Sequence, residues 1–266
     1  MKKILIMMFL IISFFAHSKE VEYNLSIDYK TVNFAGKDVV AMAINNKIPA
    51  PKLEFTVGDV AVINVENKTD KNASIHWHGL LLPQEQDGVP YLTYFPIKPK
   101  ETFQYKFEIK HEGTYWYHSH TLIDEQKGQY GSIVIHPKDG YKEKVDYDVV
   151  VQLSDWTNED PYDVLKNLKK DGDWYKYKKD SVVSILGYLK NSDLSAWFSN
   201  RWQSMNGMDV SDVGYDAYLA NGKQKLDLLH DVKSGDKVRI RLINSGASTM
   251  FDVEQNDGSF NIISAD

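Results

Sequence analysis

Short segments in which apolar and polar residues alternate are the feature that most limits what this chain can fold into. The alternation is clearest over residues 20–29, 60–66 and 102–109. Side chains of a β-strand point to opposite faces in turn, so each segment can bury one face. Turn-forming residues separate the segments: Asn45-Asn46, Gly58-Asp59 and Glu112-Gly113. The pattern predicts an all-β sandwich or barrel from residue 19 to about residue 137.

Part of this pattern occurs twice. Residues 58–67 align with residues 235–244, and Gly, Asp, Ile and Asn coincide at an offset of 177. Upstream, residues 44–47 parallel residues 220–223. Two unrelated turn-and-strand units would be the simpler interpretation, but the flanking parallel favours two copies of one β-sandwich.

We place the boundary between the copies near residues 138–144, which gives a first domain over 19–140 and a second over 141–266. Within the second domain, residues 155–215 lose the alternation and are expected to form a partly helical insertion. Asp160-Pro161 has the N-cap and first-position proline of a helix that would extend to about residue 169. A second helix is expected over residues 192–202.

The second copy is shorter than the first. About 70 residues follow the shared strand before the first domain closes, whereas only 22 follow it in the second copy. If the copies are alike, roughly 50 residues of the second sandwich are missing. We therefore expect a fragment of a longer protein or a truncated reading frame.

Two histidine triplets, His76-Trp77-His78 and His118-Ser119-His120, lie within predicted strands over residues 74–82 and 114–120. Residues i and i+2 of a strand share a face, so each triplet presents two imidazoles on one side. Random placement of eight histidines in 266 residues would give roughly 0.2 such pairs. Four converging imidazoles predict a metal site, and nitrogen ligands suit copper, zinc, iron or nickel.

The composition limits the class of protein. Apolar residues make up 42% of the chain and charged residues 26%, which is typical of a globular protein. The net charge of −6 gives no reason to expect a nucleic-acid partner.

The N-terminus has the layout of a secretory signal peptide over residues 1–18. Lys2-Lys3 precede an apolar run over residues 4–15, and Ala16-His17-Ser18 offer small residues for cleavage after Ser18. A membrane anchor is the alternative, but the run is too short to span a bilayer. We expect export to the periplasm and no stable membrane span after the signal is removed.

Three segments together carry a resemblance to a known family: His76-Trp77-His78-Gly79, residues 113–121 (GTYWYHSHT) and residues 154–161 (SDWTNEDP). With these segments the sequence resembles the multicopper oxidases, and in particular their bacterial copper-resistance subgroup. The first two segments resemble two of the family's four copper-binding motifs. The resemblance implies cupredoxin-like Greek-key β-sandwiches in three domains, of which this chain holds the first and most of the second. We therefore expect the third copper-binding domain to be absent from these 266 residues.

The resemblance also implies roles for individual residues. His76 corresponds to a ligand of the type 2 copper, His78 and His118 to ligands of one type 3 copper, and His120 to a ligand of the other. These residues would supply half of the ligands of a trinuclear copper cluster. Asp87 matches the acidic residue that helps to deliver protons to bound oxygen, although an aspartate before Gly88 is also an ordinary turn residue.

The implied activity is oxidation of Cu(I) or a phenolic reductant coupled to reduction of O₂ to water, in copper resistance. The chain has no cysteine, whereas the type 1 copper site through which electrons enter needs a thiolate. A non-catalytic, exported copper-binding protein is therefore the alternative, and a zinc hydrolase with three histidines and a water is a third class. Trp77 and Trp116 are expected either to pack on the opposite faces or to shape the site.

The remaining histidines and two methionines add little. His17 lies in the signal peptide, and His111, His136 and His230 are isolated at turns or strand ends. Met205 and Met208 could bind Cu(I) through soft thioethers, but packing is the preferred interpretation.

Overall fold

The computed structural model describes residues 18–170, 174–175, 184–191, 193–203, 213–227, 231–255 and 260–265. Its strands are β1 (Glu20–Val32), β2 (Val39–Ile44), β3 (Ala50–Thr56), β4 (Val60–Asn67), β5 (His76–His78), β6 (Thr102–Glu108), β7 (Gly113–His118), β8 (Tyr130–His136), β9 (Tyr147–Trp156), β10 (Ala217–Ala220) and β11 (Val238–Asn244). Its helices are α1 (Pro161–Lys170), α2 (Ile185–Lys190) and α3 (Leu194–Gln203), with 3₁₀ turns η1 (Gln84–Gln86) and η2 (Asp124–Lys127). The mostly β architecture confirms the predicted fold class.

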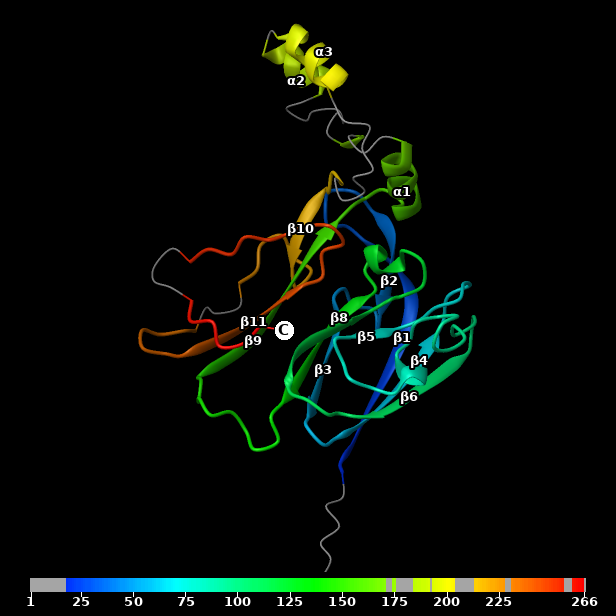
Figure 1. Ribbon diagram of the computed structural model, residues 1–266, viewed down its shortest axis with the longest axis vertical. Helices are drawn as coiled ribbons and strands as arrows, with labels where there is room; N and C mark the ends of the chain where they lie inside the picture. The colour runs from blue at the N-terminus through cyan, green and yellow to red at the C-terminus, as the bar shows by residue number, and fades with distance from the viewer. Residues whose placement is uncertain are drawn as a thin grey trace, which may run out of the picture.

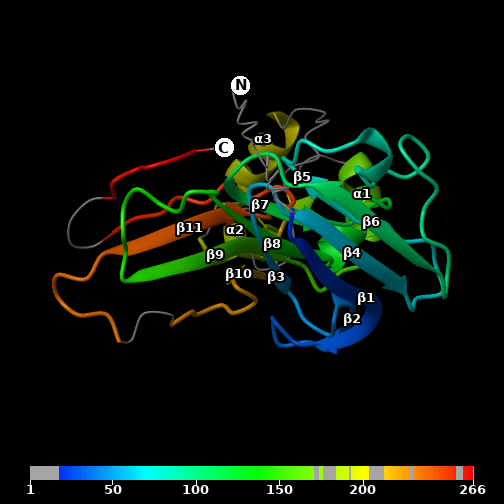
Figure 2. The same cartoon turned by 90° about the horizontal axis from the view of Figure 1, so that it is seen from below.

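The first eight strands form two four-stranded sheets that pack face to face (Figure 2). One sheet has the order β2-β1-β4-β6 and the other β3-β8-β7-β5. Because one face of each sheet points inward, the alternating apolar residues meet in a single core. Trp77, Tyr105 and Tyr117 are the largest side chains that are fully buried in it.

The remaining strands form a three-stranded sheet of order β10-β9-β11, which repeats part of the first sandwich. In β2-β1-β4 and in β10-β9-β11, the central strand pairs antiparallel with one neighbour and parallel with the other. The sequence repeat is therefore also a structural repeat.

An asparagine fixes the same turn in both copies. The backbone N–H of Ser26 donates to Asn45 Oδ1, and that of Gln152 donates to Asn221 Oδ1, at 2.6 and 2.8 Å. The side-chain amide of Asn45 donates to the carbonyl of Asn24, and that of Asn221 donates to the carbonyl of Val150. In both copies this carbonyl lies two residues before the backbone N–H that the asparagine binds. Both asparagines have positive φ, a conformation that asparagine tolerates better than most residues.

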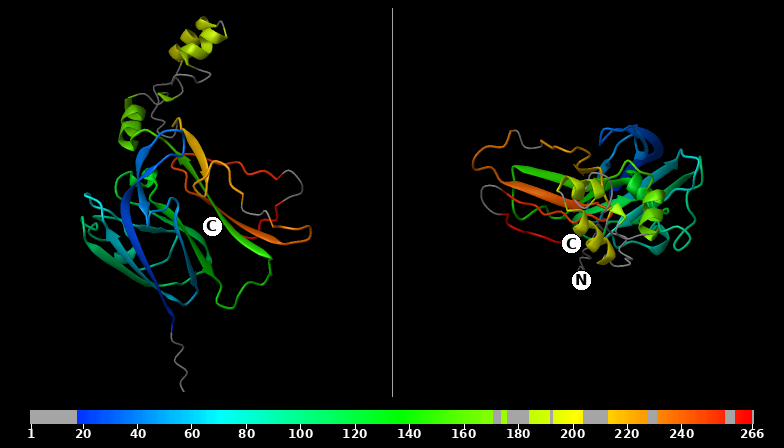
Figure 3. Two further views of the ribbon diagram at one scale, coloured as in Figure 1. Left: turned by 180° about the vertical axis from the view of Figure 1, so that it is seen from behind. Right: turned by 90° about the horizontal axis from the view of Figure 1, so that it is seen from above.

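The end of β9 packs against the first sandwich (Figure 3). Trp156 is buried there in an apolar cluster with Val32 and Ala41, and its ring lies edge-on to Phe34 at 4.8 Å between centroids. The buried Tyr130 hydroxyl of β8 donates to Ser154 Oγ at 2.8 Å. Apolar packing and a buried hydrogen bond thus connect the two repeats.

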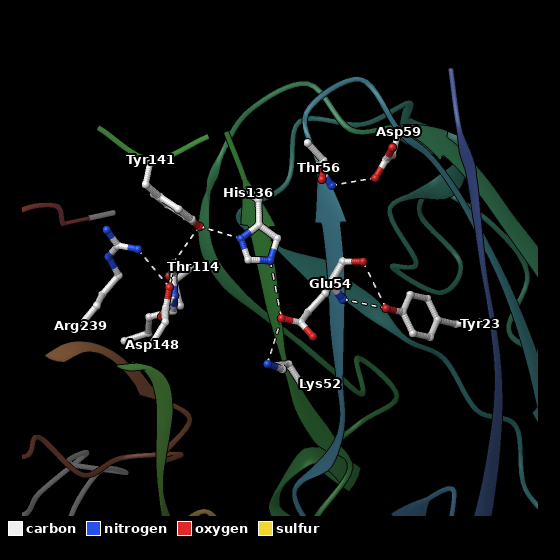
Figure 4. A network of polar contacts seen from close by, with 11 residues as sticks. Tyr23, Lys52, Glu54, Thr56, Asp59, Thr114, His136, Tyr141, Asp148 and Arg239 are labelled. Carbon is white, nitrogen blue, oxygen red and sulfur yellow. Dashed lines mark hydrogen bonds and ion pairs between the residues drawn. The ribbon is translucent and has the colours of Figure 1, made fainter. Parts of the chain in front are cut away.

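A second connection is polar and runs through Tyr141, in the segment between β8 and β9 (Figure 4). Arg241 donates to the Tyr141 hydroxyl, to Thr114 Oγ1 on β7 and to both carboxylate oxygens of Asp148. His136 Nδ1 lies 2.8 Å from the same hydroxyl. We call Tyr141, Asp148, Arg239, Arg241 and Thr114 the Tyr141 network.

Several boundaries differ from the sequence prediction. The strand expected over 74–82 is only three residues long as β5, and the strand expected over 114–120 ends at His118 in β7. The pairing partners explain both differences, because β5 has only β7 beside it and β7 pairs no further than His118.

The partly helical insertion is present. Asp160 caps α1 by accepting from the backbone N–H of Tyr162 at 2.9 Å, as predicted, and α3 matches the second expected helix. α2 was not predicted. Together α2 and α3 lie at one extremity of the molecule, beyond α1 (Figure 1). Within the described part of the chain, no helix is both long enough and apolar enough to cross a membrane.

Candidate metal centre

Pairing of β5 with β7 sets the relative positions of the histidines. His76 lies opposite His118, Trp77 opposite Tyr117, and His78 opposite Trp116. Directly opposite residues of an antiparallel pair share a face. His76, His78 and His118 therefore lie on one face, and Trp77 and Tyr117 point into the core.

His120 reaches the same place from a turn. It lies beyond the end of β7, and its backbone N–H donates to Ser74 Oγ at 3.1 Å, two residues before β5. Its ring centroid lies 5.3 Å from that of His76 and 5.9 Å from that of His118. The structure thus brings together all four imidazoles that the sequence singled out, which we call the imidazole cluster.

Three of these rings have the spacing of ligands to one ion. One nitrogen each of His76, His78 and His118 lie within 4.8 Å of one another. His78 Nδ1 and His118 Nε2 are 3.3 Å apart. Two imidazole nitrogens bound tetrahedrally at about 2.0–2.1 Å from a metal are about 3.3 Å apart, so this pair fits a shared ion. His120 is not part of this tight group.

Oxygen acceptors orient the first ring of each triplet. His76 Nδ1 lies 2.8 Å from the Asp87 carbonyl and 3.4 Å from Asp87 Oδ1. His118 Nδ1 lies 2.8 Å from the Ser119 carbonyl and 2.6 Å from Glu125 Oε2. Because all four partners are oxygens that accept, Nδ1 carries the hydrogen in both rings and donates. Nε2 of each ring then has a free lone pair for a metal.

A glycine allows Asp87 to lie beside His76. Asp87 ends the 3₁₀ turn η1, and Gly88 follows with a φ of +79°. A Cβ at Gly88 would lie 1.8 Å from the Ile75 carbonyl oxygen. Any other side chain at this position would push the turn away from β5. Asp87 is therefore both a turn residue and a neighbour of His76, and its role in proton delivery stays a prediction.

Glu125 is a site residue that the sequence did not reveal. It lies seven residues after His118, in η2, next to the buried Asp124. Spacing alone gives no reason to prefer one of these adjacent acids. Only the 3₁₀ turn decides that Glu125 approaches the ring, so no sequence signal could have identified it.

The sequence left two roles open for Trp116 and Trp77, and the structure gives each residue a different one. Trp116 stacks on the His118 ring at 4.2 Å with an interplanar angle of 17°, and lies 5.1 Å from the His78 ring. It therefore shapes the site. Trp77 packs in the core against Tyr105 and Tyr117 at 5.1 and 5.7 Å. It fixes the opposite face of β5.

The surroundings of His76 and His78 favour the neutral form of these two rings. Burial lowers the pKa of His76, although the hydrogen bond to Asp87 opposes this shift. Burial, followed by repulsion from His118, also lowers the pKa of His78. Neutral imidazole is the form that binds metals. His118 is buried, whereas His78 and His120 are exposed, so the imidazole cluster opens to solvent on one side.

The other candidates lie elsewhere. His111 Nε2 contacts the Gly79 carbonyl at 3.2 Å, and His136 lies beside Tyr141 and Glu54. Neither belongs to the imidazole cluster. His17, His230, Met205 and Met208 lie outside the described residues.

Comparison with known proteins identifies the class. The sequence profile of the family described as multicopper oxidase matches residues 26–140, the part of the chain that carries the imidazole cluster. Residues 26–140 therefore form a multicopper oxidase domain, and members of this family bind copper. The nitrogen ligands and their spacing fit that metal.

Particular relatives narrow the comparison. The chain is 39% identical to copper resistance protein A of Escherichia coli. The match covers 92% of this chain but only 42% of that protein. It is 30% identical to the multicopper oxidase MmcO of Mycobacterium tuberculosis over 83% of its length, and covers 42% of it.

Solved structures agree with the cupredoxin-like fold. The blue copper oxidase of Nitrosomonas europaea matches 86% of this chain with a TM-score of 0.60 and 28% identity, and 62% of that structure is covered. The laccase of Botrytis aclada matches 86% of this chain with a TM-score of 0.61 and 27% identity, and 38% of that structure is covered. The chain thus spans less than half the length of the curated relatives named above.

Proposed function

We propose that this chain is the N-terminal part of an exported copper oxidase that acts in copper resistance. The reaction is oxidation of Cu(I) or a phenolic compound, coupled to reduction of O₂ to water. The observation that supports this proposal above all others is the imidazole cluster, in which four rings from two triplets meet on one side of β5 and β7. Similarity to copper resistance protein A over 92% of the chain supports the physiological setting.

Each residue of the cluster has a proposed role. His76 is a ligand of a type 2 copper, His78 and His118 are ligands of one type 3 copper, and His120 is a ligand of the other. The 3.3 Å separation of His78 Nδ1 and His118 Nε2 supports the shared assignment of that pair. Copper supplies the one-electron redox chemistry when it is bound.

Asp87 is the proposed proton-delivering group. Its carboxylate lies 3.4 Å from His76 Nδ1, and its side chain is partly exposed at 30%. A carboxylate at the border between the cluster and solvent can accept a proton from water and hold it near the rings. The backbone carbonyl of the same residue holds His76 in place at 2.8 Å, so the carboxylate is not needed for that purpose.

The wider organisation is part of the proposal. Residues 1–18 are a signal peptide, and the protein is periplasmic. Residues 19–140 form the first cupredoxin domain, and residues 141–266 form an incomplete second domain. The repeated Asn45 and Asn221 turns support this division.

A copper titration tests the proposal. The purified chain should bind copper, and His118→Ala should abolish tight binding, because it removes one member of the 3.3 Å pair. His136→Ala is the matched control, since it removes an imidazole outside the cluster. Equal binding by wild type and His118→Ala would refute the ligand assignment, and zinc in place of copper in metal analysis would refute the class.

One observation favours a second function, that of a non-catalytic copper-binding protein. The sequence has no cysteine to supply the thiolate of a type 1 site. Oxygen-uptake measurements with Cu(I) and with a phenol discriminate between the two. Tight copper binding without O₂ uptake, by the chain and by a version extended to the length of its relatives, would favour the binding protein.

A further inference from the structure

The two histidine triplets are supported in parallel ways. In each, the first histidine donates its Nδ1–H to a backbone carbonyl at 2.8 Å, and a carboxylate oxygen lies close to the same nitrogen. The carboxylate comes from a 3₁₀ turn that follows the triplet, with Asp87 at the end of η1 and Glu125 within η2. The second histidine of each triplet, His78 or His120, has no such carboxylate among the described residues.

The two carboxylates do not contribute equally. Asp87 Oδ1 is 3.4 Å from His76 Nδ1, which is longer than the contact to the carbonyl. Glu125 Oε2 is 2.6 Å from His118 Nδ1, which is shorter than the contact to the Ser119 carbonyl. A polar contact this short with an ionised carboxylate is stronger than a contact with a neutral oxygen. The His118 side chain is also only 8% exposed, so little water competes for its Nδ1–H.

The loop that carries Glu125 is closed at both ends. The backbone N–H of Ser119 donates to the Gln129 carbonyl at 2.9 Å, and that of Gly128 donates to the Glu125 carbonyl at 3.0 Å. Gly128 has a φ of +106°, and a Cβ there would lie 2.4 Å from the Ile48 side chain. This backbone arrangement places Glu125 against the ring edge.

From these contacts we propose that Glu125 is a positioning residue for His118. Its carboxylate holds the ring at the edge while Trp116 stacks on the ring face, so Nε2 is directed at His78 Nδ1. The negative charge also makes the imidazole a better donor to a metal. This inference rests on the proposed copper site and assigns part of its affinity to a residue outside the ligand set.

Three variants test the assignment. Glu125→Ala removes both the contact and the charge, and Glu125→Gln keeps a side-chain oxygen without the charge. Glu85→Gln is the matched control, because Glu85 is an exposed acid on η1 and makes no hydrogen bond or ion pair within the described ranges. Copper affinity should fall by about 10–100-fold in Glu125→Ala and by less in Glu125→Gln. Glu85→Gln should leave it unchanged.

A metal-free measurement separates positioning from binding. The proton on His118 Nδ1 should give a downfield, slowly exchanging NMR signal, assigned by its loss in His118→Ala. Glu125→Ala should shift this signal upfield, with Glu125→Gln between the two, because the carbonyl of Ser119 remains as acceptor. A signal and a copper affinity that are both unchanged in Glu125→Ala would overturn the inference. If the wild-type chain binds no copper, the proposed function fails, while the ring-proton signal still decides whether Glu125 holds His118.

Discussion

Replacing Asp148 with asparagine should uncouple the second sheet from the first sandwich. Asp148 lies on β9 and accepts three hydrogen bonds, one from Arg239 at 3.0 Å and two from Arg241 at 2.7 and 2.8 Å. Arg241 also donates to Thr114 Oγ1 on β7, the strand that carries His118. Without the carboxylate, two guanidinium groups would stand side by side with no negative charge between them.

The expected loss of stability follows from burial. Removing one partner of a buried ion pair costs about 3–5 kcal/mol. Both arginine side chains are 8% exposed, but 29% of the Asp148 side chain is exposed, so water offsets part of this cost. We expect Asp148→Asn to lower the free energy of unfolding by about 2–4 kcal/mol. For a chain of this size, this is a fall in melting temperature of about 4–16 °C.

Urea and thermal unfolding of wild type and variant provide the assay. The control is Asp139→Asn, which removes the same charge from the segment just before Tyr141. Asp139 is exposed and makes no hydrogen bond or ion pair in the part of the chain that the structure covers. The control should therefore unfold like wild type.

The pH dependence of the stability tests the role of Asp148 independently. Burial by itself raises the pKa of Asp148, but hydrogen bonds from Arg241 and Arg239 outweigh it and hold the pKa below its usual value. The stabilisation is therefore complete above the unfolded-state pKa of about 3.9 and is lost as pH falls through the lower folded-state pKa. Equal stability of Asp148→Asn and Asp139→Asn near pH 7 would refute the reasoning. So would a stability difference that persists unchanged at the acid limit.

Three further predictions concern the imidazole cluster and its support. Trp77→Ala should destabilise the fold by about 3–5 kcal/mol in urea unfolding, because a fully buried ring is lost from the core face of β5. Gly88→Ala should weaken copper binding in a titration, because its Cβ would collide with the Ile75 carbonyl and displace the turn beside the first triplet. Burial lowers the pKa of His76 and His78, so protons should compete with copper for these two rings only below the usual pKa of about 6.5. Titrations at successively lower pH check this, and a loss of affinity centred on 6.5 would contradict it.

Convergence of the four histidines could be predicted from the sequence because it depends on the alternation of strands. Residues two apart share a face, and two strands in one sheet can present both pairs to the same side. The register could not be predicted. That His76 faces His118, and that β5 is only three residues long, depend on backbone pairing with β7.

The support of the cluster could not be predicted because it depends on turns. Asp87 was identified through a family resemblance, and Glu125 was missed entirely. Both approach an imidazole only because a 3₁₀ turn returns the chain to the strand, and glycines at 88 and 128 permit the close approach.

The Tyr141 network shows a further limit of reading burial from alternation. On β11, Arg239 and Arg241 are 8 and 9% exposed, whereas Ile240 and Leu242 are 37 and 47% exposed. Hydrophobicity alone would predict the reverse, with the two arginines exposed to solvent and Ile240 and Leu242 buried. The arginines are buried because Asp148 neutralises them and the Tyr141 ring covers Arg239 at 4.0 Å.

The exposed face of β11 bears on the proposed division of the chain. By the sequence repeat, Ile240 and Leu242 correspond to Ile63 and Val65 of β4, which are both 0% exposed beneath the second sheet of the first sandwich. The two strands therefore have the same apolar face, but among the described residues only the first copy has a sheet to cover it. Isoleucine and leucine at such positions are what a sandwich core requires and what a free sheet face does not. This contrast supports the proposal that residues 141–266 are an incomplete copy of the sandwich. The first copy carries the imidazole cluster, and the second contacts β7 of the first through Arg241.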